Sequence, residues 1–353
     1  DIDDGFSIRP IGEPGTVLSV TGDCAYRAAV NQDKLELCRI DLDTLRQEPI
    51  CTAPKPLRLR NAGLGTQSAD GKRLHLGAFL GDGQTEGAPW GGIIFDVEKA
   101  THHVIEYGNG FRNMHAQYSH NPEPPYCHDI TLQGAPEKFE DGSGLTPGDG
   151  SWRGKDLPPT EGKGGYHVVV RDDGTNWRML PICRDAKWHS GGHQTWRGRT
   201  DSIVTQTYNH PPGRWRAPLV EAAPVPIASR EEMTQGMHRP GTSFVDLSRR
   251  MARADSTHFG FDGSGRYCVS DTDGYATAAY SFVYIATYIT PDDDDPYLRA
   301  RYLLLPRTSW KTQEAHPHPF LSPDGRYVVF QSDFTGRPQV YVAHNFAYPE
   351  ATP

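Results

Sequence analysis

Ser322-Pro323-Asp324-Gly325-Arg326-Tyr327-Val328-Val329-Phe330 joins a tight turn to a run of β-forming residues. Asp-Gly supplies the positive φ that hairpin turns require, and the aromatic and β-branched residues after it are typical of a strand. The same phrase recurs at residues 68–76, 171–177 and 261–269. These recurring hairpins predict an all-β chain.

Almost no segment shows the 3.6-residue apolar period of a helix, and the hairpins recur at long intervals. This pattern favours a β-propeller built from four-stranded blades. A blade takes about 40–50 residues, so a chain of 353 residues suggests seven or eight blades. We expect a single domain over residues 1–353 with seven blades.

Two segments interrupt the pattern of strands. Residues 134–164 are rich in Gly, Pro, Asp and Lys, and residues 209–242 contain six prolines. Loops this long inside a compact domain are usually functional or disordered. We interpret both as insertions over one rim of the ring.

Composition excludes several classes of protein. With 37 Gly and 29 Pro the chain turns too often for a helical bundle, and no stretch has the 18 apolar residues that a membrane helix needs. A net charge of −8 argues against nucleic-acid binding, and an anionic substrate would need a local basic pocket. Six scattered cysteines without a CxxC pair favour a reducing compartment, so we expect a cytoplasmic protein, with a periplasmic one as the alternative.

The most specific polar motif is Gln313-Glu314-Ala315-His316-Pro317-His318-Pro319. Residues two apart in an extended segment share a face, so His316 and His318 are expected to project together. Gln313 lies just upstream, and His258 is a third imidazole that can complete a site. This nitrogen and oxygen set suits Mn, Fe, Co, Ni or Zn. The alternative is that these histidines only hydrogen-bond neighbouring blades.

A second motif, His189-Ser190-Gly191-Gly192-His193, combines histidines with paired glycines that allow a ligand to approach closely. A histidine there is a candidate general base because its pKa lies near working pH. Structural hydrogen bonding between blades is the alternative.

Further polar residues are candidates for contacts with a substrate. His115 and Gln117 share a face if their segment is extended. His128 follows Cys127 in a third histidine-containing segment, and Arg197 and Arg199 can supply positive charge for an anionic ligand. Structural hydrogen bonds and a solvated arginine face are the alternatives.

Taken in order, these motifs resemble the oligogalacturonate lyases, a family of seven-bladed propellers that cleave oligomers of galacturonic acid with a divalent metal, usually manganese. The resemblance runs from about residue 110 to residue 345. It implies that His193 is the catalytic base and that Cys127-His128-Asp129 matches a family Cys-His-Glu motif. The metal ligands that it implies are His258, Gln313, His316 and His318.

One position departs from that family. An arginine assists catalysis in the family, and Tyr166 stands at its place here. Tyrosine can donate a proton but cannot clamp a carboxylate with two hydrogen bonds. The resemblance therefore carries over lyase chemistry more firmly than specificity for homogalacturonan.

The expected function is metal-assisted β-elimination on a uronic-acid oligosaccharide, giving a 4,5-unsaturated product. Manganese is the expected metal, with Zn, Ni, Co or Fe as alternatives. His193 is the expected base, and Tyr166, or His167 if the register shifts, is expected to protonate the leaving oxygen or to hold the sugar. A lyase for another uronate glycan, of the ulvan or rhamnogalacturonan type, is one alternative. A non-catalytic propeller that binds proteins is the other, and the oligomeric state stays open.

Overall fold

A computed structural model of the chain describes residues 16–59, 65–82, 84, 88–108, 111, 114–134, 166–182, 189–208, 218–227, 244–251, 256–272, 281–292 and 294–350. Within these ranges the regular structure is β-strand apart from short 3₁₀ turns. All paired strands are antiparallel, as expected for hairpins joined by tight turns.

The strands of the first three sheets follow the chain order almost without exception. The first sheet contains β1 (Val17–Leu18), β2 (Cys24–Asn31), β3 (Lys34–Asp41) and β4 (Gln47–Pro54). The second contains β5 (Arg58–Leu59), β6 (Arg73–Phe79), β7 (Trp90–Asp96) and β8 (Thr101–Gly108). The third contains β9 (Gln117–Tyr118), β10 (Asp129–Gly134), β11 (Tyr166–Arg171), β12 (Arg178–Met179) and the later strand β16 (Val225–Pro226).

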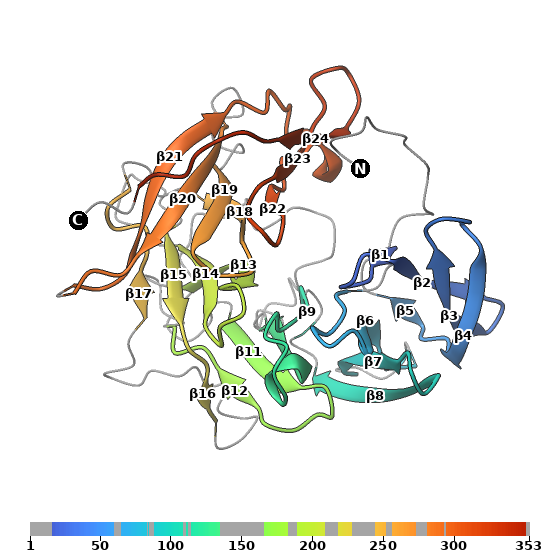
Figure 1. Ribbon diagram of the computed structural model, residues 1–353. Coiled ribbons are helices and arrows are strands. Elements are labelled where there is room, and N and C mark those ends of the chain that lie inside the picture. Colours follow the sequence, from blue (N-terminus) through green and yellow to red (C-terminus); the bar gives the residue numbers. More distant parts are fainter. Residues whose placement is uncertain are drawn as a thin grey trace.

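The remaining strands form three more sheets. The fourth contains β13 (His189–Trp196), β14 (Ile203–Tyr208), β15 (Leu219–Ala222) and β17 (Val245–Asp246). The fifth contains β18 (Ser256–Phe261), β19 (Tyr267–Thr272), β20 (Val283–Ile289) and β21 (Tyr297–Leu304). The sixth contains β22 (Phe320–Leu321), β23 (Val328–Ser332) and β24 (Gln339–Ala343). Figure 1 shows these sheets fanned in an arc in chain order.

The all-β propeller is confirmed, but the expected number of blades is wrong. The described residues form six sheets rather than seven. Dividing the chain length by the length of a blade assumed that every stretch of 40–50 residues adds a sheet. Here β16, which follows β15 in the chain, joins the third sheet as a fifth strand and does not start a new one.

The two proposed insertions lie mostly outside the described residues. Residues 218–227, inside the second of them, are an exception because they form β15 and β16. The expectation of no strand there was wrong. Leu219 and Val220 are fully buried, and prolines nearby hid this short apolar run in the sequence. That the whole chain is one domain stays a prediction.

The predicted Asp-Gly hairpins are confirmed. Their glycines have positive φ, +77° at Gly71, +82° at Gly174 and +71° at Gly325, and each precedes a strand of its sheet. In the fifth sheet the left-handed residue is Gly265 rather than the first glycine of the turn.

Successive residues of one strand face different neighbouring sheets. Val168 packs in an apolar cluster with the second sheet, whereas Val169 packs in a cluster with the fourth. In the same way, Cys268 faces the fourth sheet and Val269 faces the sixth. Since side chains alternate along a strand, the second to fifth sheets are apolar on both faces. Five such clusters separate the six sheets.

We predict that Gly325→Ala lowers the free energy of unfolding by about 1–2 kcal/mol, because an L-residue is strained at φ +71°. The matched control is Gly260→Ala, where no positive φ is required and an added Cβ meets Phe320 at an ordinary 3.9 Å. Urea denaturation measures both. Equal stability of the two variants would contradict the assignment of this turn.

Candidate metal and catalytic site

Three histidines from two sheets meet at one point. His258 lies on β18, while His316 and His318 follow the 3₁₀ turn Gln313–Ala315, before β22. One ring nitrogen from each lies within 4.8 Å of the others. The ring centroids of His258 and His318 are 4.0 Å apart. The structure thus brings together the three imidazoles that the sequence singled out.

Local backbone contacts hold the pair that follows the 3₁₀ turn. The His316 N–H donates to the Gln313 carbonyl at 3.2 Å, and Gln331 N–H on β23 donates to the Pro317 carbonyl at 2.8 Å. His316 is buried and its ring lies 4.5 Å from that of Trp310. The segment between the two histidines is therefore anchored at both ends.

Gln313 and Asp271 complete the surroundings of the three imidazoles. The side-chain amide of Gln313 lies 3.0 Å from His318 Nε2, so its oxygen can reach the same point after rotation of the amide. Asp271 accepts two hydrogen bonds from His258, from its Nδ1 and from its backbone N–H, both at 2.7 Å. The Nε2 of His258 is thereby left for a metal, the arrangement in which a carboxylate orients a metal-binding imidazole.

This donor set fits a divalent metal. Three neutral imidazoles and an amide oxygen suit Mn²⁺, Zn²⁺ and neighbouring ions, and they leave coordination positions open. Burial, reinforced by His318, holds the pKa of His258 well below its usual range, while burial raises the pKa of Asp271 to about 7. A neutral imidazole is the form that binds a metal.

His193 on β13 lies directly beside these imidazoles. Its ring centroid is 5.0 Å from that of His258 and 6.0 Å from that of His115. Burial is the main cause that lowers the pKa of His193 to about 4, so the ring is neutral at neutral pH. The ring can therefore accept a proton from a group bound next to the three histidines.

A chain of hydrogen bonds selects the tautomer of His193. Gln206 Nε2 donates to the Ser256 carbonyl at 2.6 Å, which fixes the amide so that its Oε1 faces His193 Nδ1 at 3.1 Å. Because an amide oxygen only accepts, Nδ1 carries the proton and Nε2 has the free lone pair. Gln206 is thus a positioning residue for His193.

Sequence reasoning did not identify Gln206. It lies on β14 between Thr205 and Thr207, and all three are buried. Three consecutive polar residues in the middle of a buried strand were a signal that could have found it, since buried polar groups need partners.

His115 and Gln117 both hydrogen-bond Gln194, the residue that follows His193 on β13. The His115 carbonyl accepts from Gln194 Nε2 at 2.9 Å, and Gln117 Nε2 donates to the Gln194 carbonyl at 3.0 Å. The His115 ring stacks on that of His193, whereas the Gln117 side chain joins the third and fourth sheets. Their proposed contacts with a substrate stay predictions.

Tyr166 and His167 are neighbours on β11 with different surroundings. Tyr166 is buried in an apolar cluster, its ring 6.0 Å from that of Phe111. His167 hydrogen-bonds Thr205 Oγ1 at 2.8 Å, and that hydroxyl donates to the His193 carbonyl at 2.7 Å. Burial lowers the pKa of His167 to about 3, with smaller contributions from His115 and His193. Of the two, His167 is the one linked to the base.

Three of the candidate binding residues lie away from this cluster. Arg197 donates to Glu221 Oε1 at 2.6 Å and stacks over Tyr288, and the exposed Arg199 bonds through its backbone to Gly263. Both lie beyond the last residue of β13, whereas His193 lies inside the strand. His128 contacts Asp70 and Asp172 instead. The described residues thus do not bring these three side chains to the histidine cluster.

Two histidines at the site have strained backbones. His115 has φ +40° and His318 has φ +41°, a region that residues with a Cβ rarely adopt. Such strain tends to occur where function requires a particular side-chain direction. This observation supports the site independently of the sequence motifs.

The chain is similar in sequence to two curated oligogalacturonate lyases. It is 25% identical over 180 residues to an oligogalacturonate lyase of Dickeya dadantii, and 25% identical over 181 residues to an oligogalacturonide lyase of Pectobacterium atrosepticum. Each match covers 49% of this chain and 41% of the relative. The resemblance to the oligogalacturonate lyases is confirmed. No family model matches the chain.

Solved structures with a similar fold include two oligogalacturonate lyases. An oligogalacturonate lyase in complex with manganese has a TM-score of 0.62 at 18% identity, over 96% of this chain and 77% of that one. An oligogalacturonate lyase from Vibrio parahaemolyticus has a TM-score of 0.59 at 19% identity, over 94% of this chain and 76% of that one. The curated matches span less than half the length of those relatives, so activity is treated below as a proposal.

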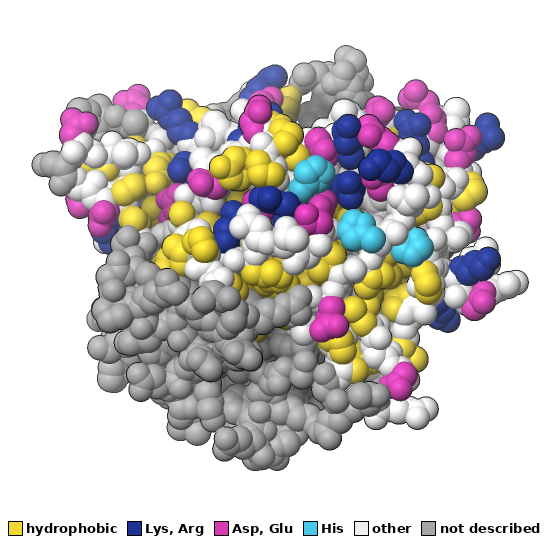
Figure 2. All heavy atoms as spheres, turned by 90° about the horizontal axis from the view of Figure 1, so that it is seen from below, with side chains coloured by type: hydrophobic (Ala, Val, Ile, Leu, Met, Phe, Trp, Pro, Cys, Tyr) yellow, Lys and Arg dark blue, Asp and Glu magenta, His cyan; other side chains and the backbone are white. Residues whose placement is uncertain are grey.

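The surface carries charges of both signs side by side. Figure 2 shows Lys and Arg among Asp and Glu on the described part of one face, with histidines between them. Lys72 pairs with Glu98 at 3.2 Å and Arg73 with Asp96 at 3.4 Å. Among the described residues, no helix has the length and apolar character needed to cross a bilayer.

We predict that the ring of His193 is protonated at Nδ1 and that Gln206→Leu abolishes this preference, because leucine offers no acceptor. Gln206→Glu keeps an acceptor and is the matched control. Nitrogen-15 NMR of histidine-labelled protein, with His193→Gln to assign the signals, measures the tautomer. An Nε2-protonated ring in the unaltered protein would contradict the hydrogen-bond chain.

Proposed function

We propose that the chain is a lyase that cleaves galacturonate oligomers by metal-assisted β-elimination. The observation that carries this proposal is the position of His193, whose ring lies 5.0 Å from that of the metal-ligand candidate His258. In a uronic acid the C5 hydrogen is only one carbon away from the carboxylate. A base that removes it must therefore lie close to the group that binds the carboxylate.

The proposed metal ligands are His258, Gln313, His316 and His318. A divalent metal bound there, manganese by preference, would supply positive charge beside the substrate carboxylate and lower the cost of charge that builds up on it during proton removal. Asp271 orients His258 for this task through two hydrogen bonds.

His193 is the proposed general base. Its Nε2 accepts the C5 proton, the electron pair left on C5 forms the double bond to C4, and the bond from C4 to the bridging oxygen breaks. The leaving sugar departs with that oxygen, which gains a proton, and the other product is a 4,5-unsaturated uronate. The bond from Gln206 to Nδ1 keeps Nε2 free for this step.

Tyr166 and His167 are the two candidates for the residue near the leaving oxygen. Tyr166 as the group that assists it stays a prediction, since its ring packs among apolar side chains. The geometry favours His167 as a positioning residue, because it holds Thr205 and Thr205 in turn holds the backbone of His193. The cytoplasmic location expected from the cysteine pattern also stays a prediction.

We expect His193→Gln to lower kcat on trigalacturonate by about 10²–10⁴-fold, the contribution typical of a general base. Metal affinity should stay unchanged, because His193 is not a proposed ligand. His344→Gln, the same change at an exposed histidine directly after β24, is the matched control. Absorbance of the unsaturated product measures the rate.

The same assay with ulvan and rhamnogalacturonan fragments tests the substrate class. Cleavage of those glycans alone would contradict galacturonate as the substrate while leaving the elimination chemistry in place. Full activity of His193→Gln would contradict the assignment of the base, and absence of an unsaturated product on every uronide would contradict a lyase.

We expect chelation to abolish the activity and added Mn²⁺ to restore it. His318→Ala should raise the dissociation constant for Mn²⁺ at least tenfold, because it removes one of three converging imidazoles. Titration calorimetry measures the affinity, with His344→Ala as the control. Activity that survives removal of all metal would contradict the metal-assisted mechanism.

A further inference from the structure

A second group of metal-binding side chains lies between the second and third sheets. Asp70, Cys127 and His128 each bring one donor atom within 4.8 Å of the other two. His128 precedes β10, whereas His115 lies near its other end, where Gln133 N–H bonds the Met114 carbonyl. The six residues of β10 span roughly 17 Å. This group is therefore separate from the histidine cluster.

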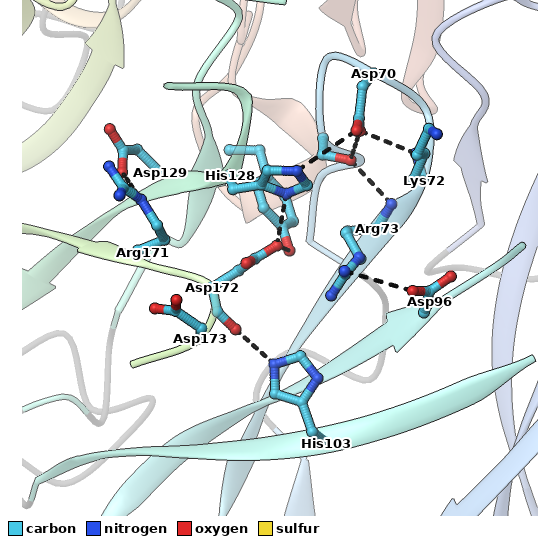
Figure 3. A network of polar contacts seen from close by, with 12 residues as sticks. Asp70, Lys72, Arg73, Asp96, His103, His128, Asp129, Arg171, Asp172 and Asp173 are labelled. Atoms are coloured by element: carbon cyan, nitrogen blue, oxygen red, sulfur yellow. Dashed lines mark hydrogen bonds and ion pairs between the residues drawn. The ribbon is translucent and has the colours of Figure 1, made fainter. Parts of the chain in front are cut away.

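His128 lies between two carboxylates, as Figure 3 shows. Its Nδ1 is 3.0 Å from Asp172 Oδ2, and its Nε2 is 3.6 Å from Asp70 Oδ2. Because a carboxylate accepts, Nδ1 is the donor toward Asp172. Tyr118 Oη donates to the same Asp172 oxygen at 3.1 Å. Nε2, on the other side of the ring, faces Asp70 Oδ2, so both atoms can contact one cation placed between them.

Asp70 is held with one oxygen directed at this point. Its Oδ1 accepts from Ser68 Oγ at 2.6 Å and from Lys72 N–H at 3.1 Å, so Oδ2 faces His128. Asp324 occupies the same turn of the sixth sheet and makes the same contacts, at 2.6 Å to Ser322 and 3.1 Å to Arg326 N–H. Among the described residues, only the Asp70 turn places a histidine and a cysteine opposite the aspartate.

The lysine and arginine side chains near this group form ion pairs with other carboxylates. Figure 3 shows Arg73 directed at Asp96 and Arg171 at Asp129, at 3.4 and 3.3 Å. The Lys72 ammonium pairs with Glu98. Within the described part of the chain, no lysine or arginine forms an ion pair with Asp70 or Asp172. Two carboxylates and a thiol therefore meet without a permanent cation to balance them.

We propose that Asp70 Oδ2, Cys127 Sγ and His128 Nε2 bind a zinc-class divalent cation. Cysteine, histidine and aspartate in one group are the ligand types that zinc prefers. Asp172 orients His128 through Nδ1, the second carboxylate that metal-binding histidines usually have. The ion is held by turns of two neighbouring sheets.

The observed separations fit such an ion. A nitrogen and an oxygen bound to one tetrahedral zinc ion lie about 3.4 Å apart, given bonds of about 2.0–2.1 Å. His128 Nε2 and Asp70 Oδ2 are 3.6 Å apart, and the thiol has to move by at most about 1 Å to join them. Cys127 is buried, whereas the side chains of His128 and Asp70 are 24% and 20% exposed. That exposure leaves a side from which water can supply the fourth ligand.

The ion would join two blades that share few other polar contacts. Asp70 lies in the turn before β6, Cys127 and His128 in the 3₁₀ turn Tyr126–His128, and Asp172 follows β11. Direct links between these sheets include the bond from His103 Nε2 to the Asp172 carbonyl at 2.5 Å and the bond from Tyr118 N–H to Thr66 Oγ1 at 2.6 Å. The site therefore stabilises the contact between the second and third sheets, and not the reaction centre.

Cobalt binding tests the proposal, because a cobalt–thiolate bond gives a near-ultraviolet charge-transfer band and the histidine cluster contains no sulfur. The protein carries His316→Ala and His318→Ala to remove the other site. We expect one equivalent of Co²⁺ with this band. Cys127→Ser should abolish the band, and Asp172→Asn should weaken binding about 10–100-fold.

Two matched controls should leave the band unchanged. Cys51→Ser removes another free thiol, and Asp324→Asn alters the equivalent turn of the sixth sheet. A band that survives Cys127→Ser, or a folded protein without a band, would overturn the proposal and leave His128 as an ion-pair link only. A second measurement leaves the proposed ligands unaltered. One equivalent of zinc is added to the protein that carries His316→Ala and His318→Ala and retains Cys127, and the neighbours of the zinc are determined by X-ray absorption. A sulfur neighbour at about 2.3 Å supports the proposal, and its absence overturns it.

Discussion

The pleat of the strands is the constraint on which the rest of the structure depends. In the second to fifth sheets each central strand lies between two neighbouring sheets. Consecutive residues must therefore be apolar toward opposite sides, as at Val168 and Val169 or at Cys268 and Val269. Because of this requirement, most residues in the middle of the strands are apolar and pack between sheets. Polar chemistry is left to strand ends, to turns and to the few buried polar runs such as Thr205–Thr207.

The histidine cluster follows from this arrangement. His193, His258 and the pair His316 and His318 come from the fourth, fifth and sixth sheets, and each is oriented by a partner on an adjacent strand or segment. Gln206 and Asp271 do this for the base and for a ligand, respectively. Because the partners accept at Nδ1, both rings present Nε2 to the same space. One type of hydrogen bond thus prepares both a base and a metal ligand.

The sequence predicted the hairpins and the three converging imidazoles because both depend on local patterns. Asp-Gly requires a turn wherever it lies, and His316-Pro317-His318 places two rings on one face. The number of blades depended on how length is divided between strands and connections, which composition does not reveal. Gln206 and Asp271 escaped notice because their roles arise only when separate strands pair. His128 resembled a binding residue until the fold placed it between two carboxylates.

The central claim is that a metal held by imidazoles of two sheets lies beside a free base. Anomalous diffraction from crystals soaked in Mn²⁺ tests it most directly. The account predicts a manganese peak among His258, His316 and His318, with the Gln313 amide oxygen in contact and His193 Nε2 outside the coordination sphere. A peak absent from this point, or one in which His193 is itself a ligand, would contradict it.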